Sequence, residues 1–133
     1  MQDDIRWIQR LSNLKRAFRL LSLSLEISAP SEVERAGIIQ FYEMTFELSW
    51  KTLKDYLQEQ GFDISSPRQA IKQAFQNGLI EDGSGWIQAL TDRNLTTHTY
   101  DEEKALQVEA SIRDHYFSLI KQLVKTLTHE AQH

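Results

Sequence analysis

The sequence contains no cysteine, which excludes disulfide bonds and thiolate metal sites and leaves the redox compartment open. Its 133 residues include only five glycines and two prolines, and this scarcity of turn residues favours long helices over a β-protein. It also lacks an apolar run long enough to span a membrane and an amino-terminal stretch of the kind that directs secretion. These absences predict a single all-α domain over residues 1–133, located in the cytoplasm.

Positive charge is also scarce, because 19 Asp and Glu residues outnumber 15 Lys and Arg residues and leave a net charge of −4. An extended basic face, which would hold nucleic acid by neutralising many phosphates, is therefore not expected. Neither DNA nor a membrane is predicted as a partner. Net charge says nothing about distribution, however, so a local basic cleft is compatible with the sequence. Any contact with RNA should then be concentrated at one site.

What the sequence does contain is helical periodicity in its first 60 residues. In the first segment, apolar residues recur every three or four positions on one stripe. They are Trp7, Leu11, Leu14, Phe18, Leu21 and Leu25. This helix should stop near Pro30, because the residue before a proline avoids the helical region. A second helix is predicted over residues 32–60, with Gly61 as its left-handed stop. Its stripe consists of Ile39, Tyr42, Phe46, Trp50, Leu53 and Leu57.

Two short helices are expected in the middle of the chain. Ser66 and Pro67 have the pattern of an N-cap followed by proline at the first helical position. The apolar residues of that helix are Ala70, Ile71, Ala74 and Phe75. After a glycine-rich turn, Ser84 is the expected cap of a helix that bears Trp86 and runs toward Arg93.

The last helix is predicted over residues 100–128, after a break at residues 96–99, which are poor in helix formers. Thr99 and Glu102 have the spacing of a capping box at its start. The helix carries two apolar stripes, one at Ala105, Val108, Ile112, Tyr116, Leu119 and Leu123, the other at Phe117, Ile120, Val124 and Leu127. The second stripe indicates either a homodimer interface or deeper burial in the same bundle. The expected fold is all-α, an up-and-down four-helix-type bundle with additional short helices that forms a homodimer.

Most motifs of known chemistry are missing. There is no glycine-rich phosphate loop, no zinc-protease helix, no nucleophile elbow and no calcium-binding loop. Of the four histidines, His129 and His133 lie near the C-terminus and are expected to be solvated, while His115 is expected to be a packing or surface residue. Neither a metal nor another cofactor is predicted.

Residues 92–100 concentrate the groups that can do chemistry, namely Arg93, Asn94, His98 and Tyr100. Arginine can hold phosphate oxygens in a bidentate fork, and histidine can accept or donate a proton near neutral pH. Together they meet the minimum need of metal-free RNA cleavage, which is to deprotonate a 2′-hydroxyl and stabilise charge on phosphorus. A break between two helices would let both side chains point at one spot. The spacing alone is also compatible with a structural role, in which Arg93 pairs with an acidic neighbour and His98 forms hydrogen bonds within a loop.

The string R-N-L-T-T-H-T-Y at residues 93–100 resembles the R-x4-H-x-Y signature of HepT-like HEPN proteins, which are also described as nucleotidyltransferase substrate-binding proteins. Two further blocks are similar, F-E-L-S-W-K-T-L-K-D-Y-L at residues 46–57 and S-P-R-Q-A-I-K-Q-A-F at residues 66–75. The resemblance covers roughly residues 41–105. In the first helix and after residue 127, the sequence resembles the family only in its general pattern of apolar and polar residues.

This resemblance implies a helical-bundle homodimer in which the motifs of both protomers face a shared cleft. The partner would be a minimal nucleotidyltransferase, and the two would form a toxin–antitoxin pair. Members with an intact motif resemble metal-independent endoribonucleases. Carried over by position, Arg93 and His98 would be the catalytic pair, Asn94 a polar support, and Tyr100 the hydroxyl to which the partner transfers AMP.

Three functions remain open on this basis. The favoured one is an RNA-cleaving toxin inhibited by its partner. The alternatives are a non-catalytic subunit that binds a nucleotide or substrate for the nucleotidyltransferase, and a dimeric interaction module. The nuclease requires Arg93 and His98 to be mobile, exposed and convergent, whereas the interaction module requires both to be buried in fixed hydrogen bonds.

Overall fold

The computed structural model describes residues 2–132, with side chains from residue 6, and every regular element in this range is a helix. The α-helices are α1 (Gln2–Ser24), α2 (Glu32–Glu59), α3 (Pro67–Gln76), α4 (Gly83–Asp92), α5 (Glu102–Ser111) and α6 (Phe117–Ala131). A 3-10 helix, η1 (Arg93–His98), follows α4, and a π-helical turn, η2 (Ile112–Tyr116), joins α5 to α6. The predicted all-α class is confirmed.

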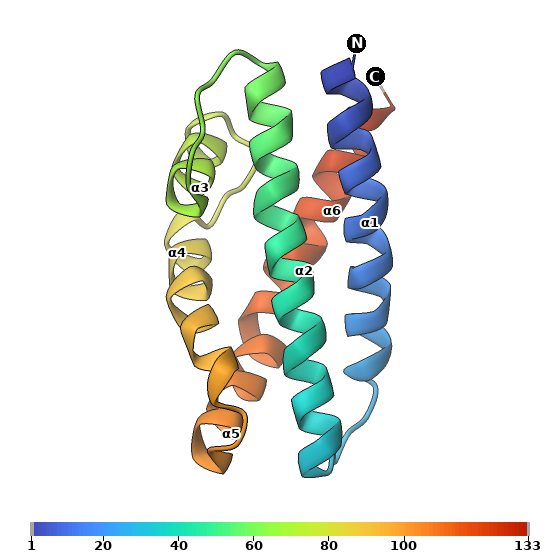
Figure 1. Ribbon diagram of the computed structural model, residues 1–133, viewed down its shortest axis with the longest axis vertical. Coiled ribbons are helices and arrows are strands. Elements are labelled where there is room, and N and C mark those ends of the chain that lie inside the picture. The colour runs from blue at the N-terminus through green and yellow to red at the C-terminus, as the bar shows by residue number, and fades with distance from the viewer. Residues whose placement is uncertain (1, 133) are drawn as a thin grey trace.

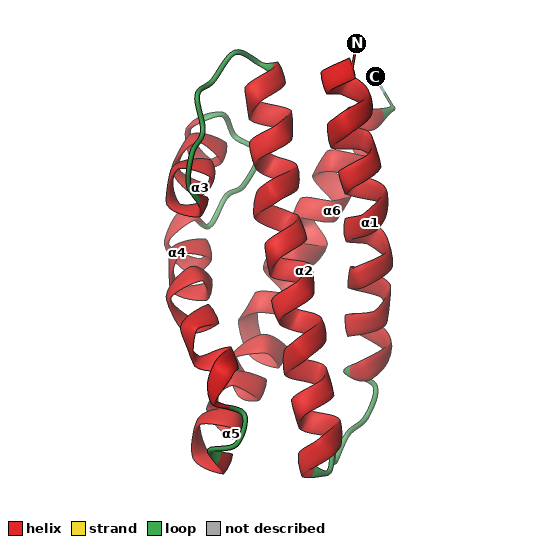
Figure 2. Ribbon diagram, in the orientation of Figure 1, coloured by secondary structure: helices red, strands yellow, loops and turns green. Residues whose placement is uncertain are grey.

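The helices form an elongated bundle with α2 near its centre. In the view of Figure 1, α1 lies on one side of α2, and α3, α4 and α5 lie on the other. Helix α6 crosses behind α2 and ends beside the start of α1, so both termini lie at one end of the bundle. The main connecting loops lie toward the two ends (Figure 2). None of the helices in the described range is both long and apolar enough to cross a membrane.

Helix α2 begins and ends where its sequence predicts. Ser31 accepts a hydrogen bond from the Glu34 backbone N–H at 3.1 Å, and the Glu34 carboxylate accepts one from the Ser31 N–H at 2.9 Å, which completes a capping box. Gly61 ends the helix with a φ of +98°, a conformation that side-chain-bearing residues rarely adopt. Ser66 caps α3 through the Gln69 N–H, with Pro67 at the first helical position, as predicted.

The predicted stripes supply the core. Most of their residues are buried, and the largest fully buried side chains include Trp86, Tyr42 and Phe46. Both stripes of the last helix pack inside the same chain, because Ile120 and Leu127 are buried and Phe117 stacks on Phe18 with ring centroids 5.0 Å apart. Burial in the same bundle therefore accounts for most of the second stripe, although Phe117 and Val124 stay partly exposed. Phe75 of α3, predicted as apolar packing, is instead 52% exposed.

The predicted end of the first helix is wrong, and the last helix contains a turn that its sequence did not predict. Helix α1 stops at Ser24, before Pro30, and Arg113 donates to the Leu25 and Ile27 carbonyls at 2.8 and 2.7 Å. A cation far away in the sequence thus satisfies backbone carbonyls just after the end of α1, and local sequence patterns do not reveal such a contact. The last helix runs without a gap from Glu102 to Ala131, as predicted in outline, but η2 forms one π turn within it.

Two predicted N-caps are also wrong, and an aspartate takes the place of a hydroxyl in each. Asp82, not Ser84, caps α4 by accepting from the Gly85 N–H at 2.9 Å. Asp101, not Thr99, caps α5 by accepting from the Lys104 N–H at 3.3 Å. A carboxylate makes the stronger, charge-assisted hydrogen bond and suits the positive end of the helix dipole.

The end of the bundle near the α1–α2 loop is held by a buried ion network. Arg35 donates to Glu109 at 2.7 Å and to Glu102 at 2.8 Å, and Arg113 donates to Glu109 at 2.8 Å. Burial acts to raise the pKa of Glu109, but the two arginine hydrogen bonds outweigh it and hold that pKa below its usual range. Glu109 therefore stays ionised and keeps both arginines in place at neutral pH.

Candidate active site on the 3-10 helix

The predicted interruption between two α-helices is present, because α4 ends at Asp92 and α5 begins at Glu102, but residues 93–98 form a 3-10 helix in place of the expected hinge. Two threonines stabilise this 3-10 helix. The Thr96 hydroxyl donates to the Arg93 carbonyl at 2.6 Å, and the Thr97 hydroxyl donates to the Asn94 carbonyl at 3.3 Å. With three residues per turn, positions 93 and 98 lie roughly 120° apart around the helix axis. The two side chains of one chain therefore do not point at one spot.

Arg93 is held by Glu47 of α2, a residue that the sequence analysis did not single out. Its Nη1 donates to Glu47 Oε1, and its guanidinium carbon lies 5.9 Å from the centre of the Phe46 ring. The side chains of Arg93 and Glu47 are 27% and 34% exposed. Since Glu47 engages a single guanidinium nitrogen, Arg93 is oriented while part of it stays accessible to an anion.

Glu47 is in turn fixed by its own helix. Trp50 Nε1 donates to Glu47 Oε2 at 3.0 Å, and Lys51 Nζ lies 3.9 Å from the same oxygen. Positions 47, 50 and 51 share one face of α2, which is the signal that could have identified Glu47. Trp50, predicted as core, thus combines partial burial against the core with a polar contact.

The residue before Arg93 is anchored to the π turn. The Tyr116 hydroxyl and Gln88 Nε2 both donate to the Asp92 carboxylate, the latter at 3.2 Å. Burial and the bond to Asp92 both raise the pKa of Tyr116. His115, also on η2, lies 3.0 Å from Asp82 Oδ2 at the start of α4. Two adjacent residues of η2 therefore contact both ends of α4 and fix the orientation of this helix, which leads directly into Arg93.

His98 and Tyr100 form a second pair. His98 Nδ1 lies 3.1 Å from the Tyr100 hydroxyl, and the two rings meet edge to face at 5.7 Å. His98 is half-buried, whereas Tyr100 is 83% exposed and Asn94 is also exposed. The structure thus brings His98 to Tyr100 and Arg93 to Glu47, and it shows no contact between these two pairs.

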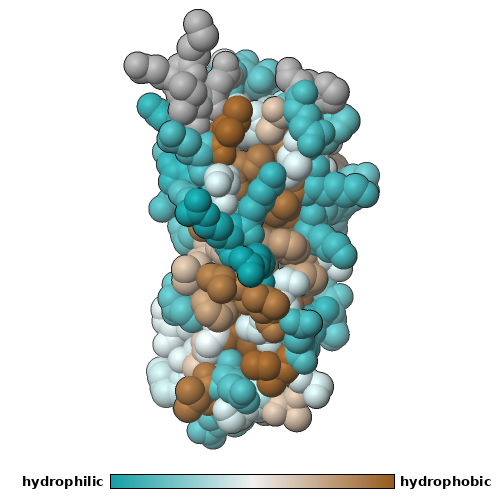
Figure 3. Space-filling view, turned by 90° about the vertical axis from the view of Figure 1, so that its right-hand side faces the viewer, coloured by the Kyte–Doolittle hydropathy of each residue, from teal (hydrophilic) through white to brown (hydrophobic). Residues whose placement is uncertain are grey.

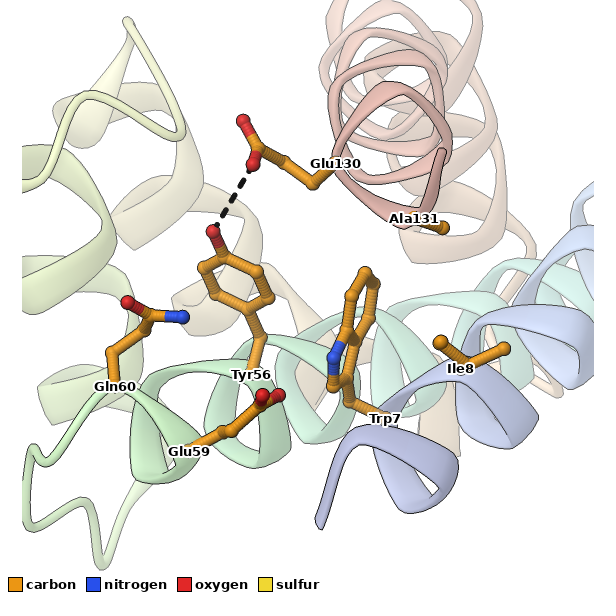
Figure 4. Close-up of a pocket in the computed structure, with 7 residues that line it drawn as sticks. All are labelled: Trp7, Ile8, Tyr56, Glu59, Gln60, Glu130 and Ala131. Atoms are coloured by element: carbon orange, nitrogen blue, oxygen red, sulfur yellow. Dashed lines mark hydrogen bonds between the residues drawn. The ribbon is translucent and has the colours of Figure 1, made fainter. Parts of the chain in front are cut away.

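The candidate site lies on the surface of the bundle. A pocket at the end of the bundle where the two termini lie is separate from it. That pocket, of about 360 Å³, is lined by Trp7, Ile8, Tyr56, Glu59, Gln60, Glu130 and Ala131 (Figure 4). The Tyr56 hydroxyl donates to Glu130 across it at 3.3 Å. Two carboxylates and no cation line the pocket, so it disfavours phosphate. Among the described residues, no three His, Asp or Glu side chains are grouped so as to hold a metal ion.

Comparison with known proteins places this chain in a family. A family model described as nucleotidyltransferase substrate binding protein like matches residues 9–129. The chain belongs to this family. It is 42% identical over 84 residues to a Haemophilus influenzae protein called "Probable ribonuclease HepT", a match that covers 59% of this chain and 58% of that protein. The matched region thus spans little more than half of the relative's length.

Two solved structures share the fold over most of this chain. A crystal structure of a Thermus thermophilus protein has a TM-score of 0.80 and 35% identity, and the match covers 86% of this chain and 98% of that one. A Haemophilus influenzae structure, described as revealing the fold of a substrate binding domain of a nucleotidyltransferase, has a TM-score of 0.80 and 33% identity, and covers 89% and 98%. The family resemblance drawn from the sequence motifs is confirmed.

Replacing Arg93 by alanine is expected to cost about 1 kcal/mol or less of unfolding free energy, because its ion pair with Glu47 is partly solvated. The matched control is Arg35→Ala, which removes a buried arginine with three hydrogen-bond acceptors and should cost clearly more. Urea unfolding of both variants makes the comparison. Losses of equal size would show that Arg93 serves the fold and would favour a plain interaction module.

Proposed function

We propose that this protein is a metal-independent endoribonuclease toxin that a nucleotidyltransferase partner holds inactive. The observation that carries the proposal is the arrangement on η1. Arg93 is oriented by Glu47 but accessible, and His98 makes its contact with Tyr100 through Nδ1 alone. Among the described residues Nε2 of His98 makes no hydrogen bond, so it is available to a substrate. Membership of a family with a probable ribonuclease relative supports the same assignment.

The chemistry follows from these two groups. When the Nδ1–H of His98 donates to the Tyr100 oxygen, Nε2 carries the lone pair and can take the proton of a ribose 2′-hydroxyl. The 2′-oxygen then attacks the adjacent phosphorus as the bond to the 5′-oxygen breaks, which yields a 2′,3′-cyclic phosphate. The 5′-oxygen takes a proton from water to become a 5′-hydroxyl, and the protonated His98 returns its proton to the solvent. Arg93 stabilises the charge that builds on the non-bridging oxygens. Asn94 follows Arg93 in the chain and is exposed, and we propose it as a polar support that contacts the RNA.

A homodimer would complete the site. Arg93 and His98 diverge around the axis of η1, so a single chain does not aim both at one phosphodiester. We propose that Arg93 of one protomer meets His98 of the partner subunit in a shared cleft, which gives two equivalent sites related by a two-fold axis.

Tyr100 is the proposed point of control. Its hydroxyl is exposed and lies beside His98, so a nucleotidyltransferase can reach it and transfer AMP to it. The new phosphodiester would place an anion next to His98, which favours the protonated imidazolium and disables it as a base. The same anion and its adenosine would repel and obstruct an RNA strand.

A second function, a non-catalytic subunit that binds a nucleotide for the nucleotidyltransferase, is favoured by one observation. Glu47 already neutralises Arg93, and within one chain Arg93 and His98 do not meet. This function predicts nucleotide binding without turnover.

An RNA that carries a single 2′-deoxy nucleotide tests the chemistry. We expect the protein in excess chelator to cut a short RNA and to leave a 2′,3′-cyclic phosphate, because the 2′-oxygen is the nucleophile. A 2′-deoxy substitution at the cut position should block that cut and leave the others unchanged. Cleavage that continues at the substituted position would refute the proposed use of His98.

A further inference from the structure

Positive charge exceeds negative charge along most of α1 and α6 in this acidic chain, although α1 begins with Asp3 and Asp4 and α6 contains Glu130 near its end. Residues 6–25 and 115–129 contain seven Lys and Arg residues and not one Asp or Glu. The rest of the chain has eight Lys and Arg residues against 19 Asp and Glu residues. The net charge of −4 therefore hides one strongly basic region on an otherwise acidic molecule.

The two basic helices lie side by side and run in opposite directions (Figure 1). Their register is fixed by the stack of Phe18 on Phe117, whose rings are nearly parallel at 8°. Lys15 lies about one turn from Phe18 and Lys121 about one turn from Phe117, and both lie toward the terminal end of the bundle in this antiparallel pair. Cations from both helices therefore flank the same seam.

Five of these cations form what we call the basic face, namely Lys15, Arg16, Arg19, Lys121 and Lys125. All five are exposed, and none makes an ion pair with any side chain that the structure describes. Arg10 differs, because it donates to Asp55 at 2.9 Å and is thereby neutralised. Unpaired cations that repel one another are costly to gather unless an anion covers them.

Apolar side chains lie among the cations. Leu20 and Leu23 of α1 are exposed, and Phe18 and Phe117 are only partly buried. The view onto the α1 side of the molecule shows strongly hydrophilic side chains at mid-height, with hydrophobic ones directly beside them (Figure 3). Cations interleaved with apolar and aromatic groups suit single-stranded RNA, whose phosphates pair with the cations and whose bases cover the apolar groups.

We propose that the basic face binds the backbone of an RNA strand at a distance from the scissile bond. This inference rests on the proposed nuclease function and adds where the substrate is held. Helix α1 lies on the opposite side of α2 from α4 and η1, so the face contacts a part of the RNA that Arg93 and His98 do not. Long RNA therefore gains affinity from the face, whereas a dinucleotide gains none.

The test compares two variants with the same loss of charge. One carries Lys15→Gln, Arg19→Gln and Lys121→Gln on the face, and the control carries Lys54→Gln, Arg68→Gln and Lys72→Gln elsewhere. Both are made in a His98→Ala background so that the RNA stays intact, and binding of a labelled single-stranded RNA that outspans the bundle is titrated at several salt concentrations. We expect the face variant to lose at least about tenfold in affinity and to reduce the salt slope by about 2, while the control changes neither.

Equal losses in both variants, or no loss in either, would overturn the proposal. So would a face variant that still binds RNA but no longer binds the purified nucleotidyltransferase, because the face would then dock a protein. Cleavage of a dinucleotide by the same triple variant with His98 restored separates this inference from the nuclease function. The basic face should not affect that cleavage, because a dinucleotide is too short to reach it. If the wild type cuts neither substrate but its RNA binding still depends on the basic face, the nuclease function is refuted and the binding role of the face is kept.

Discussion

Mixed dimers of an Arg93→Ala protomer and a His98→Ala protomer should regain about half of the wild-type RNA cleavage, although each variant alone is inactive. In such a dimer, one site lacks both groups, whereas the other combines the intact Arg93 of one protomer with the intact His98 of the partner subunit. The physical reason is the 3-10 geometry of η1, which separates the two side chains around the helix axis.

The measurement is cleavage of a labelled RNA by the two purified variants, first separately and then after equal amounts are unfolded together and refolded to exchange protomers. Random exchange places about half of the dimers in the mixed form, so the refolded mixture should recover about a quarter of the wild-type cleavage. Homodimers of each variant that pass through the same refolding serve as the control. Mixed dimers that stay inactive would show that each site takes both groups from one chain, and the shared-cleft arrangement would be wrong.

Replacing Tyr100 by phenylalanine should abolish AMP transfer by the nucleotidyltransferase and leave RNA cleavage within about tenfold of wild type, because His98 loses only one hydrogen-bond partner. Transfer is followed with ATP labelled at the α-phosphate. Tyr56→Phe is the matched control, since Tyr56 also donates a hydrogen bond through its hydroxyl but lies at the terminal pocket. A Tyr100→Phe protein that is labelled as strongly as the Tyr56→Phe protein would place the acceptor elsewhere.

Local rules predicted much of this fold because its main elements follow them. Ser31 and Glu34 cap α2 reciprocally, Gly61 ends it with a positive φ, and Ser66 and Pro67 start α3. The buried stripes were visible as periodicity because each long helix has one side to cover. The family was likewise predicted from residues 46–57, 66–75 and 93–100, and the last of these blocks stays the candidate site.

Long-range pairs could not be predicted in the same way. Arg93 and Glu47 are 46 positions apart, and Arg113 reaches the end of α1 across 88 positions, so only the packed bundle shows which residues meet. The 3-10 helix of the motif contains threonine hydroxyls that bond backbone carbonyls, and the π turn contains Tyr116 and His115, which bond side chains at both ends of α4. Such competition between local and tertiary hydrogen bonds has no signature in spacing.

RNA cleavage in excess chelator, by wild type and by a folded His98→Ala variant, tests the central claim most directly. We predict that wild type cuts a tRNA or bulk RNA pool without metal, and that His98→Ala loses activity by roughly 10²–10⁴-fold, the usual contribution of a positioned general base. Helical content and urea unfolding should match between the two proteins. Equal cleavage by both would show that His98 is not the base, and no cleavage by either would contradict the nuclease and favour the nucleotide-binding subunit.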